Sequence, residues 1–185
     1  LDHVCNLYSS LLDNINKPIV FCPPSSVGFL KHSINSQHTV SLNRISKFNK
    51  YKMIGLSEDH DLQLSRKFKI TPYMMDHRVP TIGFGISMVD KKLNPEYQGM
   101  DQSQLVALKR SGKEINVVNV KRMILFCGDT SAMAIPNLPF NEYPYVIIEC
   151  TFLDPEHYPE AMERKHLHYC DLESSFNDNL ETTFI

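Results

Sequence analysis

The sequence has no long apolar run, little net charge and no closely spaced cysteines. None of its apolar stretches approaches the roughly 20 residues of a membrane-spanning helix, so we expect no membrane span. The formal net charge of −2 excludes the global basic field that many nucleic-acid-binding domains carry. Any contact with nucleic acid would therefore depend on a local cluster of cations.

The five cysteines are scattered along the chain, and no two of them stand in CxxC spacing. This pattern argues against a disulfide scaffold and against a thiolate zinc site. Asp2 and His3 stand where a signal peptide would need a basic and then an apolar region. We therefore expect reduced thiols in an intracellular compartment, which is the cytoplasm, the nucleus or an organelle matrix.

The composition is that of one ordinary globular domain. Of the 185 residues, 42% are hydrophobic and 22% are charged, and the length suffices for a full core. Strand-like runs alternate with helical stretches, which predicts a single α/β domain with mixed sheets over residues 1–185. The eight histidines are more than a domain of this size usually carries, which hints at metal chemistry.

Alternating and continuous apolar runs predict the strands. They are residues 18–22, 51–56, a hairpin over 62–77 that turns near Ser65 and Arg66, 82–89, 117–126 and 145–148. Lys121 and Arg122 interrupt the run 117–126, so we expect a break there. Gly83 and Gly85 inside an apolar run indicate positions where another part of the chain approaches the backbone closely.

The expected helices are residues 7–12, 27–34 and 159–165, followed by an acidic segment that is also helical. Residues 33–49 are polar and indicate loop with some helix. Residues 90–116 are basic, and Lys109 and Arg110 before Gly112 are typical of a cationic helix end with a glycine stop. We therefore expect residues 90–116 to be helical.

Acidic and histidine side chains directly follow several strand-like runs. They are Asp76 and His77, Asp129 after Gly128, Glu149, and the Asp2–His3 pair at the start. Strand ends gathered at one edge of a sheet build a site from residues far apart in the sequence. Because carboxylates and imidazoles suit zinc or manganese, the pattern predicts a hydrolytic metal site. Two alternatives stay open here: Asp129 as a cap of its own turn, and His77 as a structural histidine.

Several short segments carry a resemblance to a known family. They are LDHV at 1–4, DHRVPTIGF at 76–84, LNPEYQG at 93–99, LKRSGKEI at 108–115, GDT at 128–130, ECTFL at 149–153 and KHLH at 165–168. In their order and spacing they resemble ribonuclease Z, the tRNA 3′-processing endonuclease family, in its short form. The resemblance implies a metallo-β-lactamase-like αββα sandwich with two zinc ions at the edge of the sheets.

The resemblance implies a set of metal ligands in this chain. Asp2 and His3 would bind the second zinc ion, His77 would bind the first, and Asp129 would bridge both, since a carboxylate offers two oxygens. The paired ions would activate a water and clamp the scissile phosphate of a precursor tRNA. Asp2 would also orient that water as a base.

The resemblance also implies a general acid. His166, assisted by Glu149, would protonate the leaving 3′-oxygen, so that the product ends in a 3′-hydroxyl. His168, two residues further on, is expected either to be structural or to face the substrate.

Residues 91–116 resemble the substrate-binding arm of the family in a shortened form. Its cations would dock on tRNA phosphates, and they are Lys91, Lys92, Lys109, Arg110 and Lys113. The alternative is an ordinary solvated charged face. The resemblance also implies a homodimer, in which one subunit's arm serves the other's site, and a ribonucleoprotein assembly is the alternative partner.

Two parts of the family's metal site have no counterpart in the sequence. An HxH pair would precede residue 1 and a last histidine would follow Ile185, so we expect the fold to be incomplete at both ends. Lys165 replaces the family's usual glycine before His166, which favours one alternative, a non-catalytic subunit of an RNA-processing or ribonucleoprotein assembly. A third hypothesis is another phosphodiester hydrolase on the same fold.

Overall fold

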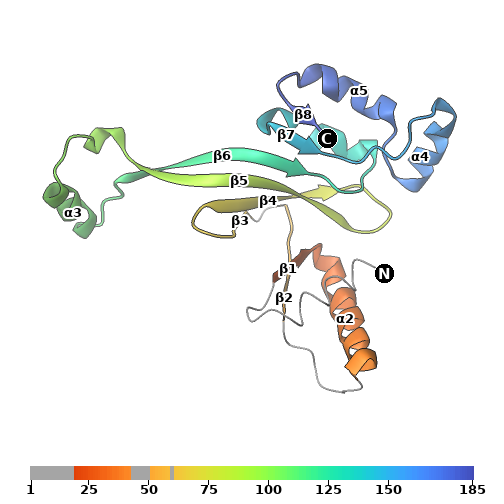
Figure 1. Ribbon diagram of the computed structural model, residues 1–185, viewed down its shortest axis with the longest axis horizontal. Helices are drawn as coiled ribbons and strands as arrows, with labels where there is room; N and C mark the ends of the chain where they lie inside the picture. Colours follow the sequence, from red (N-terminus) through yellow and green to blue (C-terminus); the bar gives the residue numbers. More distant parts are fainter. Residues whose placement is uncertain (1–18, 43–50, 59–60) are drawn as a thin grey trace.

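The computed structural model describes residues 19–42, 51–58 and 61–185, and its main body is one six-stranded sheet (Figure 1). The strand order is β3–β4–β5–β6–β7–β8. The strands are β3 Leu62–Gln63, β4 Phe68–Met75, β5 Thr81–Leu93, β6 Asn116–Phe126, β7 Tyr145–Ile147 and β8 Thr183–Phe184. Helices α4 Tyr158–Arg164 and α5 Tyr169–Asp178 lie between β7 and β8 in the sequence and at one end of the sheet in space (Figure 1).

Four strands of this sheet run in the same direction. β4 and β6 are both antiparallel to β5, and β7 and β8 continue parallel to β6. The carboxyl ends of β4, β6, β7 and β8 therefore meet at one edge of the sheet. Side chains that follow these strands in the sequence are brought to a common place.

β5 and β6 are much longer than their neighbours and form a two-stranded ribbon that leaves the body of the sheet (Figure 1). At its far end lie the short helix η2 Pro95–Tyr97 and the helix α3 Gln102–Arg110. α3 begins at a capping box, in which Asp101 accepts from the Gln104 amide and Gln104 accepts from the Asp101 amide. We call residues 91–116 the arm.

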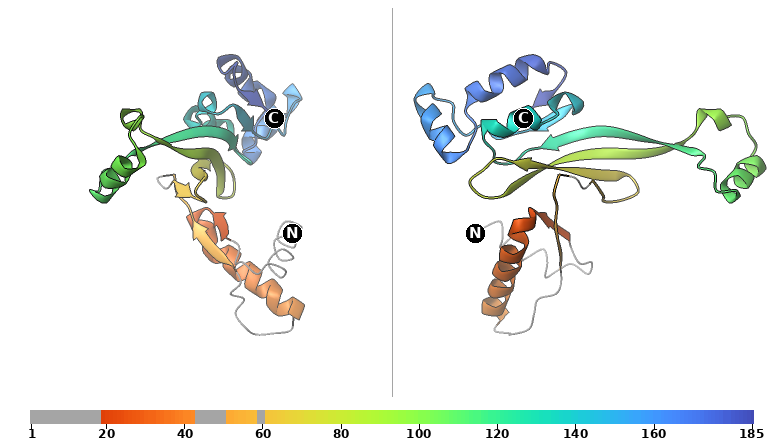
Figure 2. Two further views of the ribbon diagram at one scale, coloured as in Figure 1. Left: turned by 60° about the vertical axis from the view of Figure 1, so that its left-hand side comes forward. Right: turned by 180° about the vertical axis from the view of Figure 1, so that it is seen from behind.

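A second, smaller unit precedes the main sheet. β1 Ile19–Cys22 pairs in parallel with β2 Lys52–Gly55, and η1 Pro24–Ser26 leads into the helix α2 Val27–Leu42. In two views this unit lies on one side of the main sheet (Figure 2). Its own small core contains Cys22, Ile34, Tyr51 and Met53.

The main core lies where β6 and β7 meet the loop between them. Its buried residues are Met75, Leu125, Cys127, Ala134, Leu138, Phe140, Tyr143 and Val146. Leu125 and Val146 are fully buried, and burial of such side chains stabilises the fold by about 1.5–3 kcal/mol each. The short helices η3 Ala132–Asn137 and η4 Phe140–Glu142 supply the other side of this core.

The close approach expected at the two glycines is confirmed. A Cβ added to Gly85 would lie 2.0 Å from the Tyr143 hydroxyl, and one added to Gly83 would lie 2.7 Å from the Phe126 carbonyl oxygen. Only a residue without a side chain fits at either position.

Several expected elements are confirmed, and three are corrected. The hairpin of β3 and β4, the strand β7 and the helices α4 and α5 lie close to their predicted positions. Residues 90–116 are not one helical region, because β5 runs on to Leu93 and only α3 is α-helical. β6 is not broken at Lys121 and Arg122, although its register with β5 shifts by one residue beside Arg122. α2 extends to Leu42, beyond the predicted end at residue 34, and the predicted helix 7–12 lies outside the described residues.

The structure bears on two expectations from the composition, which concern a membrane span and the state of the cysteines. None of the helices among them combines the length and apolar character that crossing a membrane requires. Cys22, Cys127, Cys150 and Cys170 are free thiols, and burial raises the pKa of the Cys127 thiol to about 12.

Candidate metal and catalytic centre

Three predicted site residues meet at the shared edge of the sheet. Ligand-capable atoms of His77, Asp129 and His166 all lie within 4.8 Å of one another. His77 follows β4, Asp129 follows β6, and His166 follows α4. Asp2 and His3, also predicted to belong to this site, lie outside the described residues.

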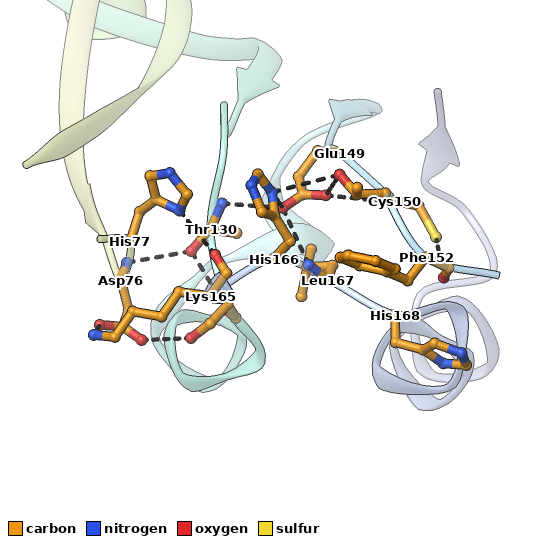
Figure 3. Close-up of polar contacts among 12 residues, drawn as sticks. Asp76, His77, Thr130, Glu149, Cys150, Phe152, Lys165, His166, Leu167 and His168 are labelled. Carbon is orange, nitrogen blue, oxygen red and sulfur yellow. Dashed lines mark hydrogen bonds and ion pairs between the residues drawn. The ribbon is translucent and has the colours of Figure 1, made fainter. Parts of the chain in front are cut away.

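The His77 ring is oriented by a backbone carbonyl. Its Nδ1 donates to the carbonyl oxygen of Lys165 at 2.8 Å (Figure 3). Because a carbonyl only accepts hydrogen bonds, the proton of the neutral ring is on Nδ1, and the lone pair of Nε2 is left for another partner. This arrangement is typical of metal-binding histidines, whose second nitrogen is held by an outer acceptor. The His77 and His166 rings pack edge to face, with centroids 4.7 Å apart.

The Asp76 side chain is not part of the His77, Asp129 and His166 cluster. It links the segment before His77 to Lys165 and to Ser131. Its carboxylate accepts from the Lys165 ammonium at 2.6 Å and from the Ser131 hydroxyl. Its backbone amide donates to the Thr130 hydroxyl at 3.2 Å, and its carbonyl accepts from the Ser131 amide at 2.7 Å. Hydrogen bonds from Lys165 and Ser131 lower the pKa of Asp76, so it carries a negative charge at neutral pH.

Lys165 ends α4 in the left-handed conformation, with φ of 57°. Glycine adopts this conformation without the steric cost that a Cβ imposes, so the glycine expected here from the resemblance would fit the backbone without strain. Lysine here gains the ion pair with Asp76 in exchange for that cost. Lys165 therefore has two roles. Its backbone turns the chain toward His166, and its side chain forms an ion pair with Asp76.

Glu149 holds His166 in place. One of its oxygens accepts from His166 Nδ1 at 2.8 Å and from the Leu167 amide at 3.1 Å. The other accepts from the amide and hydroxyl of Thr151 at 2.9 and 2.7 Å. The carboxylate therefore fixes the tautomer of His166, and Nε2 of that ring is left to face a substrate or a metal ion.

The environment keeps Glu149 ionised. Burial raises its pKa, but hydrogen bonds from Thr151, His166 and the amides of Leu167 and Thr130 outweigh this effect, and the pKa is lowered below the ordinary glutamate value. Its side chain is only 12% exposed, so the carboxylate itself is largely shielded from water. Because both oxygens of the Glu149 carboxylate accept hydrogen bonds, the carboxylate holds the His166 ring in a fixed orientation.

Asp129 lies on a turn that the buried core supports. Cys127 before it is fully buried and donates its amide to Ile147, and Gly128 turns the chain with φ of 68°. Thr130 after it is fully buried as well. Asp129 itself is exposed, so a rigid turn presents its carboxylate to solvent beside the two histidines.

His168 is structural. Its Nε2 donates to the Asp154 carbonyl at 3.0 Å, and its Nδ1 accepts from the Cys170 amide at 3.1 Å, which caps α5. It is 1% exposed and points away from His166 (Figure 3). Of the two roles left open for His168, the structural one holds.

The predicted substrate-binding cations all lie on or beside the arm, away from the cluster. Lys91 and Lys92 are exposed residues of β5, and Lys109 and Arg110 form the last turn of α3. Lys113 lies over the Tyr97 ring, 5.4 Å from its centroid. The arm carries these charges on a ribbon and a capped helix rather than on one continuous helix.

The donor set fits a divalent cation such as zinc. His77 and Asp129 offer an imidazole and a carboxylate, which are ligand types that zinc prefers, and the Lys165 carbonyl orients the His77 ring. His166 lies within 4.8 Å of both, and Glu149 orients its ring, so Nε2 can either bind a metal ion or carry a proton to a substrate, but not both at once. Sequence reasoning named Asp76 among the side chains of the predicted metal site but not as a support for it, and it missed Ser131 and Lys165 as supports of this centre. Only the glycine-to-lysine departure at Lys165 could have indicated one of them.

Comparison with known proteins agrees with this geometry. No family model matches the chain. A curated chloroplastic tRNase Z of Arabidopsis thaliana, TRZ2, is 29% identical over 161 residues, which are 83% of this chain and 44% of the relative. A second, tRNase Z TRZ1 of the same plant, is 24% identical over 84% of this chain and 56% of the relative. The chain thus spans about half the length of the curated relatives that it matches.

A solved structure shares the fold. The crystal structure of human tRNase Z, short form, matches with a TM-score of 0.52 and 14% identity, over 96% of this chain and 62% of that chain. The expected α/β, metallo-β-lactamase-like fold is confirmed, and so is the resemblance to ribonuclease Z. The sheets among the described residues are the six-stranded sheet and the two-stranded sheet of β1 and β2, so these residues do not form a complete αββα sandwich.

Proposed function

We propose that the full protein is a zinc-dependent endoribonuclease that cleaves precursor tRNA on the 3′ side and leaves a 3′-hydroxyl. The observation that carries the proposal is the meeting of His77, Asp129 and His166 at one edge of the sheet, with Glu149 behind His166. The two Arabidopsis relatives are named tRNase Z, which supports the choice of tRNA as the substrate.

His77 and Asp129 would hold the metal, together with Asp2 and His3 from outside the described residues. A carboxylate has two oxygens, so Asp129 can serve two ions. When bound, zinc ions here would supply positive charge that acidifies an attacking water and stabilises the negative charge on the phosphate. Asp2 would orient that water.

His166 is the proposed general acid. Glu149 holds Nδ1 of the ring, so Nε2 is the atom that would carry a proton to the leaving 3′-oxygen. Thr151 and the Leu167 amide restrain the carboxylate in turn, which limits the ring to the orientation that faces the cluster. Lys91, Lys92, Lys109, Arg110 and Lys113 of the arm would contact tRNA phosphates.

The test is cleavage of a precursor tRNA with a 3′ trailer by the full protein. Asp129→Ala should lower the cleavage rate by at least about a hundredfold, because it removes an anchor of the positive charge. Asp178→Ala, an exposed carboxylate on α5, is the matched control and should cleave at the wild-type rate. Undiminished cleavage by Asp129→Ala would refute the proposal. A stably folded protein with well under one zinc per chain and no cleavage would support a non-catalytic subunit instead.

A further inference from the structure

We propose that a notch at the base of the arm binds the phosphate backbone of the RNA substrate. The notch is a cavity of about 590 Å³ between the β3–β4 hairpin and β5. Arg66, Lys67 and Lys91 line it, together with Gln63 and Ser65. The proposal rests on the proposed function, since it names a further contact for the same substrate, and it adds Arg66 and Lys67 from outside the arm.

The notch exists because β4 does not pair with the last residues of β5. Phe68, the first residue of β4, pairs with Met88, whereas β5 continues to Leu93 along β6 alone. The Lys67 carbonyl accepts from the Val89 amide at 2.7 Å and closes one end of the notch. Backbone groups of a strand alternate in direction, so the Lys91 N–H points to the same open edge as that of Val89. An N–H at this edge of β5, where the pairing with β4 has ended, is a suitable donor to an anionic oxygen.

Positive charge predominates in the notch. Arg66, Lys67 and Lys91 are all exposed. The one acidic side chain of the lining, Asp90, has its carboxylate 3.7 Å from the Lys92 ammonium, which offsets its charge. In a chain with a net charge of −2, this is a local concentration of cations of the kind that phosphate contacts need.

The hairpin turn that carries the two new cations is well held. The Ser65 hydroxyl accepts from the amides of Lys67 and Phe68, both at 3.2 Å. The Leu64 and Ser65 amides donate to the Phe68 carbonyl at 2.9 and 3.2 Å. Arg66 and Lys67 therefore extend from a backbone that is already ordered, which reduces the entropy lost on binding.

The position of the notch favours an extended polyanion over a single free phosphate. In two opposite views the hairpin turn lies between the α4 end of the sheet and α3 at the tip of the arm (Figures 1 and 2). Phe84 of β5 pairs with Phe126, which lies three residues before Asp129 of the candidate metal site. Lys91 is seven residues further along β5, so the notch lies about 23 Å from that site. An RNA that reached both the cluster and the tip of the arm would pass the notch.

The decisive variant is the double substitution Arg66→Gln/Lys67→Gln in the full protein. Lys31→Gln/Lys52→Gln is its matched control, because it removes the same charge from exposed positions on α2 and β2. Affinity for labelled precursor tRNA, measured by fluorescence anisotropy across a salt series, should fall about tenfold at low salt for the notch variant only. Its slope of log affinity against log salt should decrease by about 1 to 2, as expected for one or two lost phosphate contacts. KM for cleavage should rise with kcat unchanged.

Each outcome bears on the proposal. If wild-type protein cleaves precursor tRNA but the notch and control variants bind it equally, the notch proposal fails and the proposed function stands. If wild-type protein neither binds nor cleaves precursor tRNA, both fail. Competition by polyglutamate as strong as that by unlabelled RNA would identify the notch as a site for acidic protein segments and overturn the assignment to RNA. Unfolding curves that match wild type establish that the variants are folded.

Discussion

The Lys165 ammonium lies 2.6 Å from Oδ1 of Asp76, and the Lys165 carbonyl accepts from the ring of His77. Asp76 precedes His77 and Lys165 precedes His166, so this one residue connects the two segments that carry the clustered histidines. Its left-handed backbone is the conformation that glycine adopts most readily. Side chain and backbone at position 165 thus make opposite contributions to stability.

These contributions can be separated by comparing Lys165→Gly with Lys165→Ala. Both variants lose the ion pair, which contributes at most about 1 kcal/mol because the lysine side chain is 44% exposed. Only glycine relieves the left-handed strain, so Lys165→Gly should be more stable than Lys165→Ala by about 1 kcal/mol. Urea unfolding at low salt measures the difference. Equal midpoints would mean that the backbone at this position is not strained.

Metal binding should stabilise the folded protein through His77 and Asp129. Any ligand of the folded state raises the free energy of unfolding, by about 2.7 kcal/mol at a concentration 100 times its Kd. Zinc should therefore raise the Tm of wild-type protein, and His77→Ala and Asp129→Asn should abolish most of that rise. Asp178→Asn, on α5, is the control and should keep it. A full zinc-induced shift in both site variants would place the metal elsewhere.

Glu149→Gln should lower stability in a pH-dependent way. The pKa of Glu149 is lower in the folded protein than its ordinary value of 4.5. Its carboxylate therefore contributes stability that is fully present above that ordinary value and is lost as the pH falls through the lower, folded-state pKa. The variant should be less stable than wild type by about 1–3 kcal/mol at pH 7. Urea unfolding at pH 7 and at pH values below 4.5 tests this, since the difference should shrink in acid.

An exposed glutamate on α5 provides the comparison for that experiment. Glu173→Gln removes the same charge from a solvated position and should change stability by less than about 0.5 kcal/mol. A Glu149→Gln effect of the same size at every pH would contradict the assignment of the ionised carboxylate as the anchor of His166.

Gly85→Ala should destabilise the main core. The added methyl group would lie 2.0 Å from the Tyr143 hydroxyl oxygen and 2.7 Å from Cζ of the same ring, which forces the ring to move. Such overpacking costs about 1–3 kcal/mol. Gly28→Ala in α2 meets nothing within 4 Å and should be neutral or stabilising. Thermal unfolding of the two variants distinguishes a tight contact from a general effect of removing glycine.

The elements that the sequence predicted well are those with a local signal. The apolar run that ends in Gly128 and Asp129 is a strand followed by a turn, although only Leu125 of β6 is buried, and Lys109, Arg110 and Gly112 mark the end of α3 as expected. The arm was predicted less well. Residues 90–116 were expected to be helical, whereas β5 runs on to Leu93. Asp90, Lys91 and Lys92 are exposed, so this part of the strand lacks the apolar alternation that identifies a strand.

The sequence by itself determined which residue types follow which strands, and with them the resemblance to ribonuclease Z. Only the tertiary structure decided that β4 and β6 run in the same direction and end at one edge, which brings His77 and Asp129 together. It also decided that Lys165 reaches Asp76, a partner 89 positions away. Periodicity and capping signals report on neighbours within a few residues, whereas such pairs depend on how the whole sheet is ordered. Asp129 could therefore be recognised as a candidate ligand from its strand, but its partners could be assigned only from the fold.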